Sequence, residues 1–591
     1  MASLLSLNNP ITHPSSSYLR PSYQKQSQVS AVVKRSYCIG NIVCNASRNG
    51  DQEGSASNSK GEKIVDRRNV LIGLGGLYGV AGLSATGADR LAIGAPIIPP
   101  DFTKCGPPDL PAGAKPVNCC PPTDFKIFDF KPPSHSAPLR IRQAAHLVDN
   151  EYIAKYTEAY ELMRALPEDD PRSFKQQANI HCAYCDGAYD QIGFPDLQIQ
   201  VHNSWLFFPF HRYYLYFHEK ILGSLIGDPT FALPFWNWDS PAGMRMPKYY
   251  TNSKSALYNK LRDAKHQPPT LIDLNFTTTD ATNTEQQRID SNLSTMYRQM
   301  VSNGKTAQLF LGTPYRAGDK SDPGAGALEN LPHGPVHLWV GDRTQPNGED
   351  MGNFYSAARD PVFYSHHSNC DRMWSVWKDL GGKRKDFTDP DWLNSGFLFY
   401  DENADLVRVK VKDCLDEKNL RYMYQEVEIP WMKSRPTPRV RKVKRSIKDL
   451  VEKVKHKIHH GYPKALDQII TVTVPRPRKS RSKKDKDDEE EILVIKDIEL
   501  ERDTVVKFDV FINDEDEATL NPQKSEFAGS FVNVPHKHGK KKKLKTDFKL
   551  GITDLMEDLD AEDDDEVVVT IVPRQGTEGV TIGGIKIVFG S

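Results

Sequence analysis

Apolar positions recur at helical spacing in five segments between residues 149 and 380, and at strand-like spacing in much of the chain after residue 390. We expect α-helices over residues 149–166, 173–188, 204–226, 284–302 and 360–380. Short strands are predicted at 397–400 and 406–411. Further β-type runs occupy residues 469–474, 492–495, 505–512, 567–572 and 580–589. The pattern predicts a mainly α domain followed, from about residue 463, by a separate β domain.

Polar segments interrupt this pattern. Residues 95–123 are rich in Pro, Gly and Cys and predict a loop tied down by disulfides. A basic run at 433–445 indicates a charged linker or surface helix; it could bind an anionic partner, but we favour a linker exposed to proteases. The charge-dense segments 476–491 and 557–566 indicate solvated loops inside the β domain.

Composition narrows the class of protein. The 591 residues include 77 basic and 77 acidic side chains, so no whole-protein field attracts nucleic acid or an anionic membrane. No apolar run reaches the length of about 18 residues that a membrane-spanning helix needs. With 38% apolar and 9% aromatic residues, most of the chain can fold. Collagen-like, wholly disordered and integral membrane proteins are excluded, and we expect a soluble or peripheral protein.

The N-terminus has the pattern of a targeting segment. Residues 1–50 contain ten Ser, five Lys or Arg, and no acidic residue, as in an organellar transit peptide. Arg67-Arg68, the apolar run 70–85 and a zone of small residues then form a second, translocating signal. The alternative is that 70–85 is a buried Gly-rich segment or a weak membrane anchor. We interpret residues 1–94 as a bipartite route through the chloroplast to the thylakoid lumen.

Two sets of histidines stand out from the seventeen in the chain, because each lies in aromatic, helix-forming surroundings. An isolated histidine on a helix is usually a core or surface residue. The first set is His181, His202 and His211; the nine-residue gap between the last two puts them out of phase on one helix, so His202 precedes a helix that contains His211. In the second set His333 and His337 are four apart and project together. The third member is His366 or His367.

The histidine sets predict a dinuclear metal site. The segment from His333 to His337 lacks the glutamate of a zinc protease His-Glu-x-x-His motif. Two all-imidazole sites argue against magnesium, calcium and carboxylate-bridged iron, but imidazole suits several transition metals. The residues alone therefore leave the metal open.

Several ordered motifs resemble the plant polyphenol oxidases, the catechol oxidases and tyrosinases of the type-3 copper family. They are His181-Cys182-Ala183-Tyr184-Cys185, the segments 201–211, 333–337 and 360–374, Asp391-Trp392-Leu393, Tyr422-Met423-Tyr424 and Lys507-Phe508-Asp509-Val510. The resemblance covers nearly the whole chain. It implies an α catalytic domain whose four-helix bundle holds two copper ions (residues 95–430), a basic linker (431–462) and a β-sandwich-like C-terminal domain (463–591) that shields the site.

The resemblance also assigns ligands and covalent links. It implies that His181, His202 and His211 bind the first copper and that His333, His337 and His367 bind the second. In this family the ligand is the seventh residue after the Asp of Asp-Pro, which selects His367 over His366. A thioether between Cys185 and His202 is implied, as are the disulfides Cys105–Cys120 and Cys119–Cys182. Five reduced buried thiols are the alternative, which a lumenal address disfavours.

Four further residues receive roles from the resemblance. Phe354 matches the aromatic gate over the copper pair, the alternative being an ordinary core residue. Glu329 matches an acidic residue that orients a water and that could act as a general base. Asp371 either orients a ligating histidine or pairs with Arg372 or another neighbour. Gly334 stands where family members that hydroxylate monophenols well often carry Asn.

The implied activity is the oxidation of small o-diphenols by dioxygen to o-quinones, in a latent enzyme activated when a protease acting at the linker removes the C-terminal domain. The alternatives are a tyrosinase-like hydroxylase of one specialised monophenol, a hemocyanin-like oxygen carrier and a structural zinc protein. The plant-type address argues against an oxygen carrier, and two open three-histidine sites argue against structural zinc.

Overall fold

A computed structural model describes residues 94–122, 126–280, 282–436, 447–455, 461–514, 522–536 and 543–590. The contacts divide the chain into units 1–89 and 90–591, and all described residues belong to the second unit. The predicted targeting segment, apart from Gly94, and the part of the basic linker at 437–446 lie outside the described residues.

The five predicted helices are present within a few residues of their expected bounds. They are α2 (Asn150–Ala165), α3 (Phe174–Cys185), α4 (Phe207–Leu225), α5 (Glu285–Tyr297) and α9 (Val362–Asp379). Side chains of Asp149, Ser173 and Thr284 accept hydrogen bonds from backbone N–H groups of the first turns of α2, α3 and α5, which fixes where these helices begin. Helix α4 starts later than predicted, and Pro209 lies in its first turn, where no backbone donor is needed.

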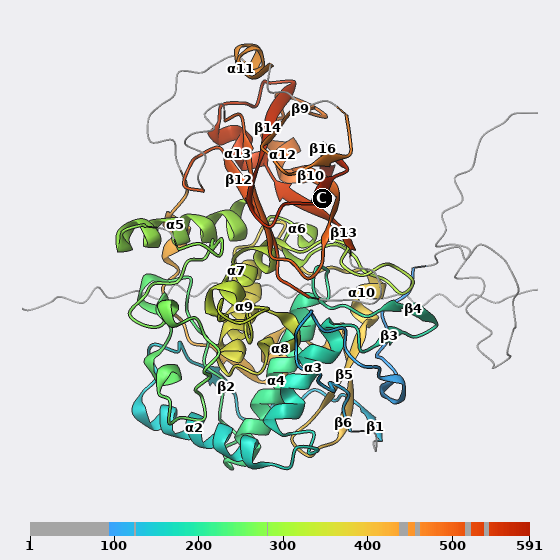
Figure 1. Cartoon of the computed structure of the whole chain (residues 1–591), viewed down its shortest axis with the longest axis vertical. Helices are drawn as coiled ribbons and strands as arrows, with labels where there is room; N and C mark the ends of the chain where they lie inside the picture. The colour runs from blue at the N-terminus through green and yellow to red at the C-terminus, as the bar shows by residue number, and fades with distance from the viewer. Residues whose placement is uncertain are drawn as a thin grey trace, which may run out of the picture. The chain divides into compact units, whose positions relative to one another are not determined.

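Shorter helices and small sheets complete the α domain (Figure 1). The helices are α6 (Ala307–Leu311), the π-helical segments η5 (Arg298–Ser302) and η6 (Glu329–His333), α7 (Gly334–Val340), α8 (Phe354–Ala357) and α10 (Pro390–Asn394), and α11 (Ile447–Val454) lies within the linker. Short 3-10 turns occupy Phe102–Lys104, Pro241–Gly243, Lys248–Thr251, Ala264–His266, Val411–Asp413, Glu417–Leu420 and Pro430–Lys433. The strands are β1 (Ile127–Asp129), β5 (Gly396–Tyr400) and β6 (Leu406–Lys410) in one sheet, and the pairs β2 (Arg140–Arg142) with β7 (Tyr422–Tyr424) and β3 (Asp190–Gln191) with β4 (Phe194–Gln198).

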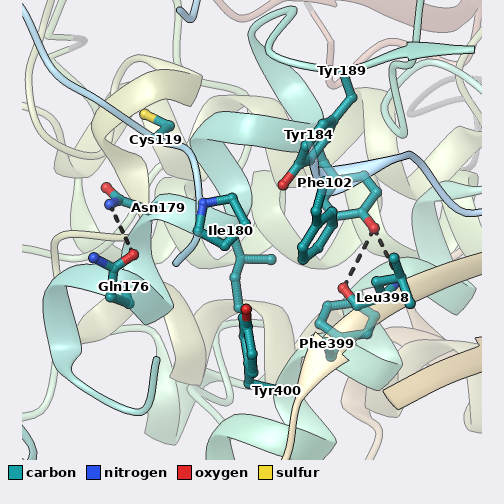
Figure 2. Close-up of a pocket in the computed structure, with 11 residues that line it drawn as sticks. Phe102, Cys119, Gln176, Asn179, Ile180, Tyr184, Tyr189, Leu398, Phe399 and Tyr400 are labelled. Carbon is teal, nitrogen blue, oxygen red and sulfur yellow. Dashed lines mark hydrogen bonds between the residues drawn. The ribbon is translucent and has the colours of Figure 1, made fainter. Parts of the chain in front are cut away.

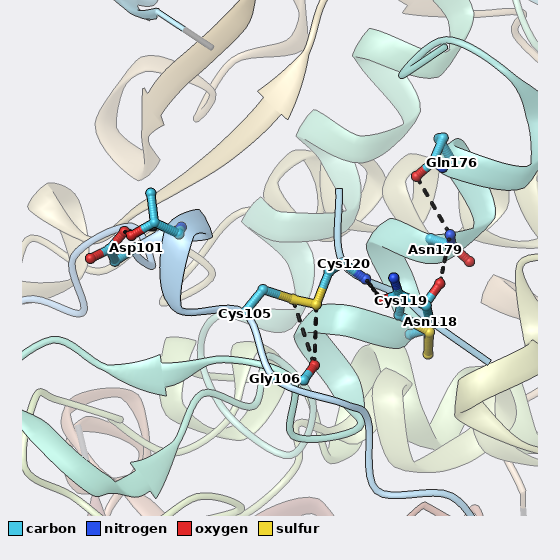
Figure 3. The surroundings of a disulfide bond; sticks show 10 residues. Asp101, Cys105, Gly106, Asn118, Cys119, Cys120, Gln176 and Asn179 are labelled. Carbon is cyan, nitrogen blue, oxygen red and sulfur yellow. Dashed lines mark hydrogen bonds between the residues drawn. A yellow bond between two sulfur atoms is a disulfide. The ribbon is translucent and has the colours of Figure 1, made fainter. Parts of the chain in front are cut away.

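The N-terminal segment is fastened to α3. Disulfides Cys105–Cys120 and Cys119–Cys182 are both present, as predicted, with Cα–Cα distances of 5.7 and 5.9 Å. Figure 3 shows the first of them. Phe102 of this segment stacks on Tyr189 and lies 6.5 Å from Tyr400 of β5, while the hydroxyl of Tyr184 in α3 accepts a hydrogen bond from the backbone N–H of Leu398 in β5 (Figure 2). A disulfide thus links the segment to α3, and ring packing links it to the β1-β6-β5 sheet.

The C-terminal domain consists of two sheets around one apolar core. One has the order β13-β10-β15-β8, with β16 also paired to β10, and the other has the order β12-β11-β14-β9. The bounds are β8 Lys464–Ala465, β9 Ile470–Pro475, β10 Glu490–Glu501, β11 Val506–Ile512, β12 Phe527–Asn533, β13 Lys543–Gly551, β14 Glu566–Gln575, β15 Thr581–Ile582 and β16 Gly584–Gly590, with helices α12 (Lys483–Asp488) and α13 (Thr553–Asp558). Phe508 and Phe531 of one sheet contact Phe548 of the other, which confirms the sandwich-like domain.

The charge-dense segments of this domain are mostly exposed, as predicted, but the first contains helix α12 and the two are joined at one buried point. The guanidinium of Arg476 is buried, pairs with both oxygens of Glu491 and donates to the carbonyls of residues 561, 562 and 564. Because a buried charge needs such partners, the two segments hold each other in place. In the described residues no helix is both long and apolar enough to cross a membrane.

Candidate dinuclear metal centre

The first histidine set converges from three places in the fold. His181 lies on α3, His211 on α4 and His202 in the loop that precedes α4, as the spacing predicted. All three side chains are buried, and their candidate ligand atoms lie within 4.8 Å of one another. Ring centroids of His202 are 5.1 Å from those of both His181 and His211. The set can therefore hold one metal ion.

The second set lies on η6, α7 and α9. His333, His337, His366 and His367 are buried, with candidate ligand atoms within the same 4.8 Å limit. The ring centroids of His333 are 4.6 Å from His337 and 5.0 Å from His367. The rings of His211 and His367 stack at 4.1 Å, which brings the two sets face to face.

Hydrogen bonds orient most of these rings by one nitrogen and leave the other free. The Nδ1 atoms of His181, His211, His333 and His337 lie 2.8–2.9 Å from the backbone carbonyls of Phe354, Phe207, Glu329 and Met351 respectively. The Nδ1 of His202 lies 3.2 Å from Oε1 of Gln200. The Nε2 atoms of His181, His202, His211 and His333 are buried and have no hydrogen-bond partner among the described residues.

These orphaned nitrogens fit a metal centre. A buried polar atom without a partner is costly, and one metal ion in each set would together satisfy all four atoms. Burial lowers the pKa of His181 to about 3 and that of His337 to about 4, so both imidazoles are neutral, the form that binds metals. With neutral nitrogen donors and no carboxylate in either set, the donors suit copper.

His366 and His367 differ in what their nitrogens contact. The Nδ1 of His366 accepts a hydrogen bond from the indole of Trp238, and its Nε2 lies 4.0 Å from the sulfur of Cys370. The Nε2 of His367 lies 3.2 Å from the Nε2 of His337, and its Nδ1 has no partner among the described residues. His366 thus already has a partner at each nitrogen. The Nε2 atom of His367, by contrast, lies close enough to that of His337 for both to bind the same metal ion.

Glu329 borders the centre with one free carboxylate oxygen. Its Oε1 accepts a hydrogen bond of 2.5 Å from the backbone N–H of Asn203, the residue after His202. Its Oε2 is buried and has no hydrogen-bond partner among the described residues. Burial raises the pKa of Glu329 well above that of an ordinary carboxyl group. The group is therefore able to take up and release a proton.

Phe354 lies against the first histidine set. Its ring stacks on His202 with centroids 4.0 Å apart, while its carbonyl orients His181. The opposite neighbour is His536 of the C-terminal domain, 5.2 Å away and nearly parallel. The backbone N–H of Phe354 donates to the carbonyl of Pro535. Sequence reasoning missed His536, because nothing in its local pattern relates it to the histidine sets.

Asp371 does not orient a ligating histidine, and it does not pair with Arg372. Its carboxylate binds Arg212 of α4 and Arg142 of β2, and accepts hydrogen bonds from Tyr422 and Tyr424 of β7. The ligand-orienting role expected from its place after the histidine doublet is therefore wrong. The buried network instead fastens α4 and α9 to the β2–β7 pair. Its member on α4 is Arg212, the residue that follows His211.

Gln200 is another residue that sequence reasoning missed. Its side-chain amide donates to the carbonyl of Cys185 and accepts from the backbone N–H of His202. It therefore joins the end of α3 to the loop that carries His202. The sulfur of Cys185 is buried and forms no disulfide.

Comparisons with known proteins agree with this fold and site. The common central domain of tyrosinase matches residues 171–380, the polyphenol oxidase middle domain matches 386–437, and the chloroplastic polyphenol oxidase C-terminal domain matches 462–589. The chloroplastic polyphenol oxidase of Malus domestica is 60% identical over 99% of this chain and 98% of its own length. The chloroplastic (+)-larreatricin hydroxylase of Larrea tridentata is 50% identical over 100% and 99%. The solved structure of latent apple tyrosinase shares 63% identity and a TM-score of 0.75, over 79% of this chain and 100% of that one.

Fold and site together define an oxidoreductase with a type-3 dinuclear copper centre, built on a helical catalytic core. The chain belongs to the tyrosinase family, among its chloroplastic polyphenol oxidases. Its cofactor is a pair of copper ions, and its location is the chloroplast.

Proposed function

We propose that the protein oxidises o-diphenols to o-quinones with reduction of dioxygen to water. The observation that carries this function is the pair of facing three-histidine sets with their orphaned Nε2 atoms. When bound, the copper pair supplies the redox chemistry, in which two diphenols and one dioxygen become two quinones and two waters. Oxygen uptake with catechol by the copper-loaded chain tests the proposal, and no uptake at full copper loading would refute it.

We assign His181, His202 and His211 to the first copper, and His333, His337 and His367 to the second. The backbone contacts of four of these rings, those of His181, His211, His333 and His337, support the assignment, because they hold each ring before metal arrives. A thioether between Cys185 and His202 would fix a fifth ring, whose own contact is to a side chain. The bridge that Gln200 makes between these two residues supports it. Mass spectrometry of the mature protein, which would be two hydrogens lighter, tests this link.

Glu329 acts as the proton acceptor for the bound phenol, directly or through a water. Its free Oε2 and its raised pKa support this role, since a diphenol must lose its protons as it gives up electrons. Phe354 limits which rings reach the centre by lying flat over His202.

The C-terminal domain (463–591) keeps the enzyme latent, and removal of that domain at the linker (431–462) activates the catalytic domain (95–430). Contacts between these parts support this account. A Cβ atom at Gly334, next to His333, would lie 3.1 Å from Val532 and 3.3 Å from Val534. Asn330 bonds to the backbone of residues 530 and 532, and Asp322 pairs with Arg502. Segment 530–536 thus covers the side of the centre at which a phenol would enter.

The mature protein acts in the thylakoid lumen after removal of residues 1–94. The acid-free Ser-rich start, the twin arginine and the apolar run support this route. The two disulfides agree with an oxidising compartment. Import into isolated chloroplasts, followed by fractionation, tests the location; recovery of the mature form in the stroma would contradict it.

The alternative is a specialised monophenol hydroxylase, which the Larrea relative favours by its name. Gly334 argues for the diphenol oxidase, since it offers no side chain beside His333 to help deprotonate a monophenol. The ratio of tyrosine to catechol turnover by the cleaved enzyme separates the two functions.

A further inference from the structure

A column of tyrosines runs along one face of α2. Tyr152, Tyr156 and Tyr160 are spaced four apart, with ring centroids separated by 5.9 and 5.2 Å. Tyr156 and Tyr160 are fully buried, whereas Tyr152 is half-buried at the outer end. None of these residues has a part in the chemistry described above.

The inner end of the column reaches the metal centre through α9. The rings of Tyr160 and Tyr364 are 6.4 Å apart, and Tyr364 adjoins Phe363 at 5.2 Å. Phe363 in turn lies 4.2 Å from His367 and 4.9 Å from His181, one histidine of each set. Aromatic rings therefore form a continuous series from the histidines to the half-buried Tyr152.

The imidazole of His218 is placed to accept the hydroxyl proton of Tyr160. The hydroxyl of Tyr160 lies 2.9 Å from Nε2 of His218, and the imidazole stacks on Tyr364 with centroids 3.7 Å apart. The amide nitrogen of Gln177 donates to the carbonyl of Pro171, so its Oε1 is the atom that faces Nδ1 of His218, at 3.4 Å. Nδ1 therefore carries the hydrogen and Nε2 accepts from the tyrosine.

This arrangement has the parts that reversible oxidation of a tyrosine needs. Burial raises the pKa of Tyr160 and lowers that of His218, so the resting pair is a neutral phenol and a neutral imidazole. A buried phenol can lose an electron at low cost only if its proton leaves at the same time, because a cationic radical in the core is unfavourable. If Tyr160 and His218 served only to pack the core, neither the hydrogen bond between them nor a fixed tautomer of His218 would be needed.

We propose that Tyr160 and His218 are a redox-active pair, and that Tyr364, Tyr160, Tyr156 and Tyr152 carry single electrons from the surface to the metal centre. The oxidant is the dioxygen of the enzyme's own reaction, on whose proposed function this inference rests. Tyr160 gives one electron to the centre and its O–H proton to Nε2 of His218, which leaves a neutral tyrosyl radical and an imidazolium. A soluble one-electron donor such as ascorbate returns an electron through Tyr152, the proton goes back to the phenol oxygen, and the donor releases its own proton to water. When no phenol is bound, electrons that arrive by this route reduce the oxidising species at the metal centre, which would otherwise attack the histidines.

The test uses the copper-loaded chain from residue 95 with hydrogen peroxide as oxidant and no phenol. Samples frozen after mixing are expected to show a tyrosyl radical by electron paramagnetic resonance, which added ascorbate removes. The Tyr160→Phe variant, which keeps the ring, and His218→Phe, which keeps the stacking on Tyr364, are expected to lose this signal. Tyr213→Phe is the matched control, because Tyr213 is a buried tyrosine outside the series that also has one hydrogen bond to lose, to the carbonyl of Lys410.

A second measurement links the radical to enzyme survival. Tyr160→Phe is expected to keep the initial rate of catechol oxidation and to inactivate after fewer turnovers than Tyr213→Phe. An unchanged radical signal in Tyr160→Phe, or no tyrosyl radical in the wild-type enzyme that oxidises catechol normally, would overturn the inference. Failure of the wild-type enzyme to oxidise catechol would instead refute the proposed function, so the two failures are distinguishable.

Discussion

A hydrogen bond joins Asn330 of the α domain to Val532 of the C-terminal domain: the side-chain oxygen of Asn330 accepts from the backbone N–H of Val532 at 2.8 Å. The same amide donates to the carbonyl of Ser530, also at 2.8 Å. Asn330 is three residues before His333, and Val532 is in β12 of the C-terminal domain. A side chain three residues from His333 therefore holds strand β12 of the C-terminal domain in place.

Replacing Asn330 with Ala is expected to weaken latency. Two hydrogen bonds of about 1 kcal/mol each are lost, so the segment detaches more often. The intact Asn330→Ala chain should oxidise catechol faster than the intact wild-type chain, and the two should be equal after proteolytic removal of the C-terminal domain. Equal rates before cleavage would show that Asn330 does not hold the shield.

A side chain at Gly334 is expected to weaken the same contact with the C-terminal domain, also from the catalytic domain. In Gly334→Ala the new methyl group lies 3.1 Å from Val532, which should cost about 1 kcal/mol of docking. Val532→Ala makes room for it, so the double variant should be more latent than Gly334→Ala alone. A double-mutant cycle on the intact-to-cleaved activity ratio measures this coupling, and additive effects would contradict it.

Glu329→Gln is expected to slow catalysis without loss of copper. The amide oxygen can still accept from the N–H of Asn203, but the side chain no longer takes up a proton, so kcat should fall about 100-fold. Copper content by metal analysis and kcat for catechol with cleaved enzyme check this. A variant with normal copper and normal kcat would remove Glu329 from the mechanism.

The copper-free protein is expected to lose stability as the pH falls below the ordinary range of histidine. Burial lowers the pKa of His181 to about 3 and that of His337 to about 4, from the ordinary value of 6.5, so the folded state binds fewer protons than the unfolded chain between these limits. The stability that these two neutral imidazoles contribute is fully present above about pH 6.5 and is lost as the pH falls through 4 and 3. Thermal unfolding of the copper-free form at several pH values tests this; a Tm that does not fall between about pH 6.5 and pH 4 would contradict it.

Of the two disulfides, Cys119–Cys182 is expected to matter more for the first copper. Cys182 adjoins His181, and the bond spans 63 residues, against 15 for Cys105–Cys120. Replacing both Cys119 and Cys182 with Ala should cost about 2–4 kcal/mol of stability and weaken copper retention. The matched control replaces Cys105 and Cys120, and should retain copper. Equal copper loss from both variants would argue against a local effect on His181.

Much of the fold follows from local sequence signals. The helices that carry His181, His211 and His367 were predicted, because each has apolar residues at helical spacing; only the first of them also has a side-chain cap, Ser173. Strands β12 and β13 were missed. β12 contains Gly529 and Ser530 between its apolar residues, and β13 alternates Lys with apolar residues, so neither has a continuous apolar run.

The candidate site was predictable only as far as spacing allows. Spacing paired His333 with His337, but the backbone carbonyls that orient the rings come from distant segments, as Met351 does for His337. Asp371 illustrates the converse. Its place after the histidine doublet suggested a ligand partner, yet the arginines that surround it lie far away in the sequence. Such long-range pairs leave no local pattern.

Metal analysis combined with catechol oxidation, on the chain from residue 95 after proteolytic removal of the C-terminal domain, tests the central claim most directly. The account predicts two copper ions per wild-type chain with rapid oxygen uptake, and one copper with no uptake when either His211 or His337 is replaced by Ala. A wild-type chain that binds fewer than two copper ions yet oxidises catechol, or a His337→Ala variant that keeps both copper ions and full activity, would contradict it.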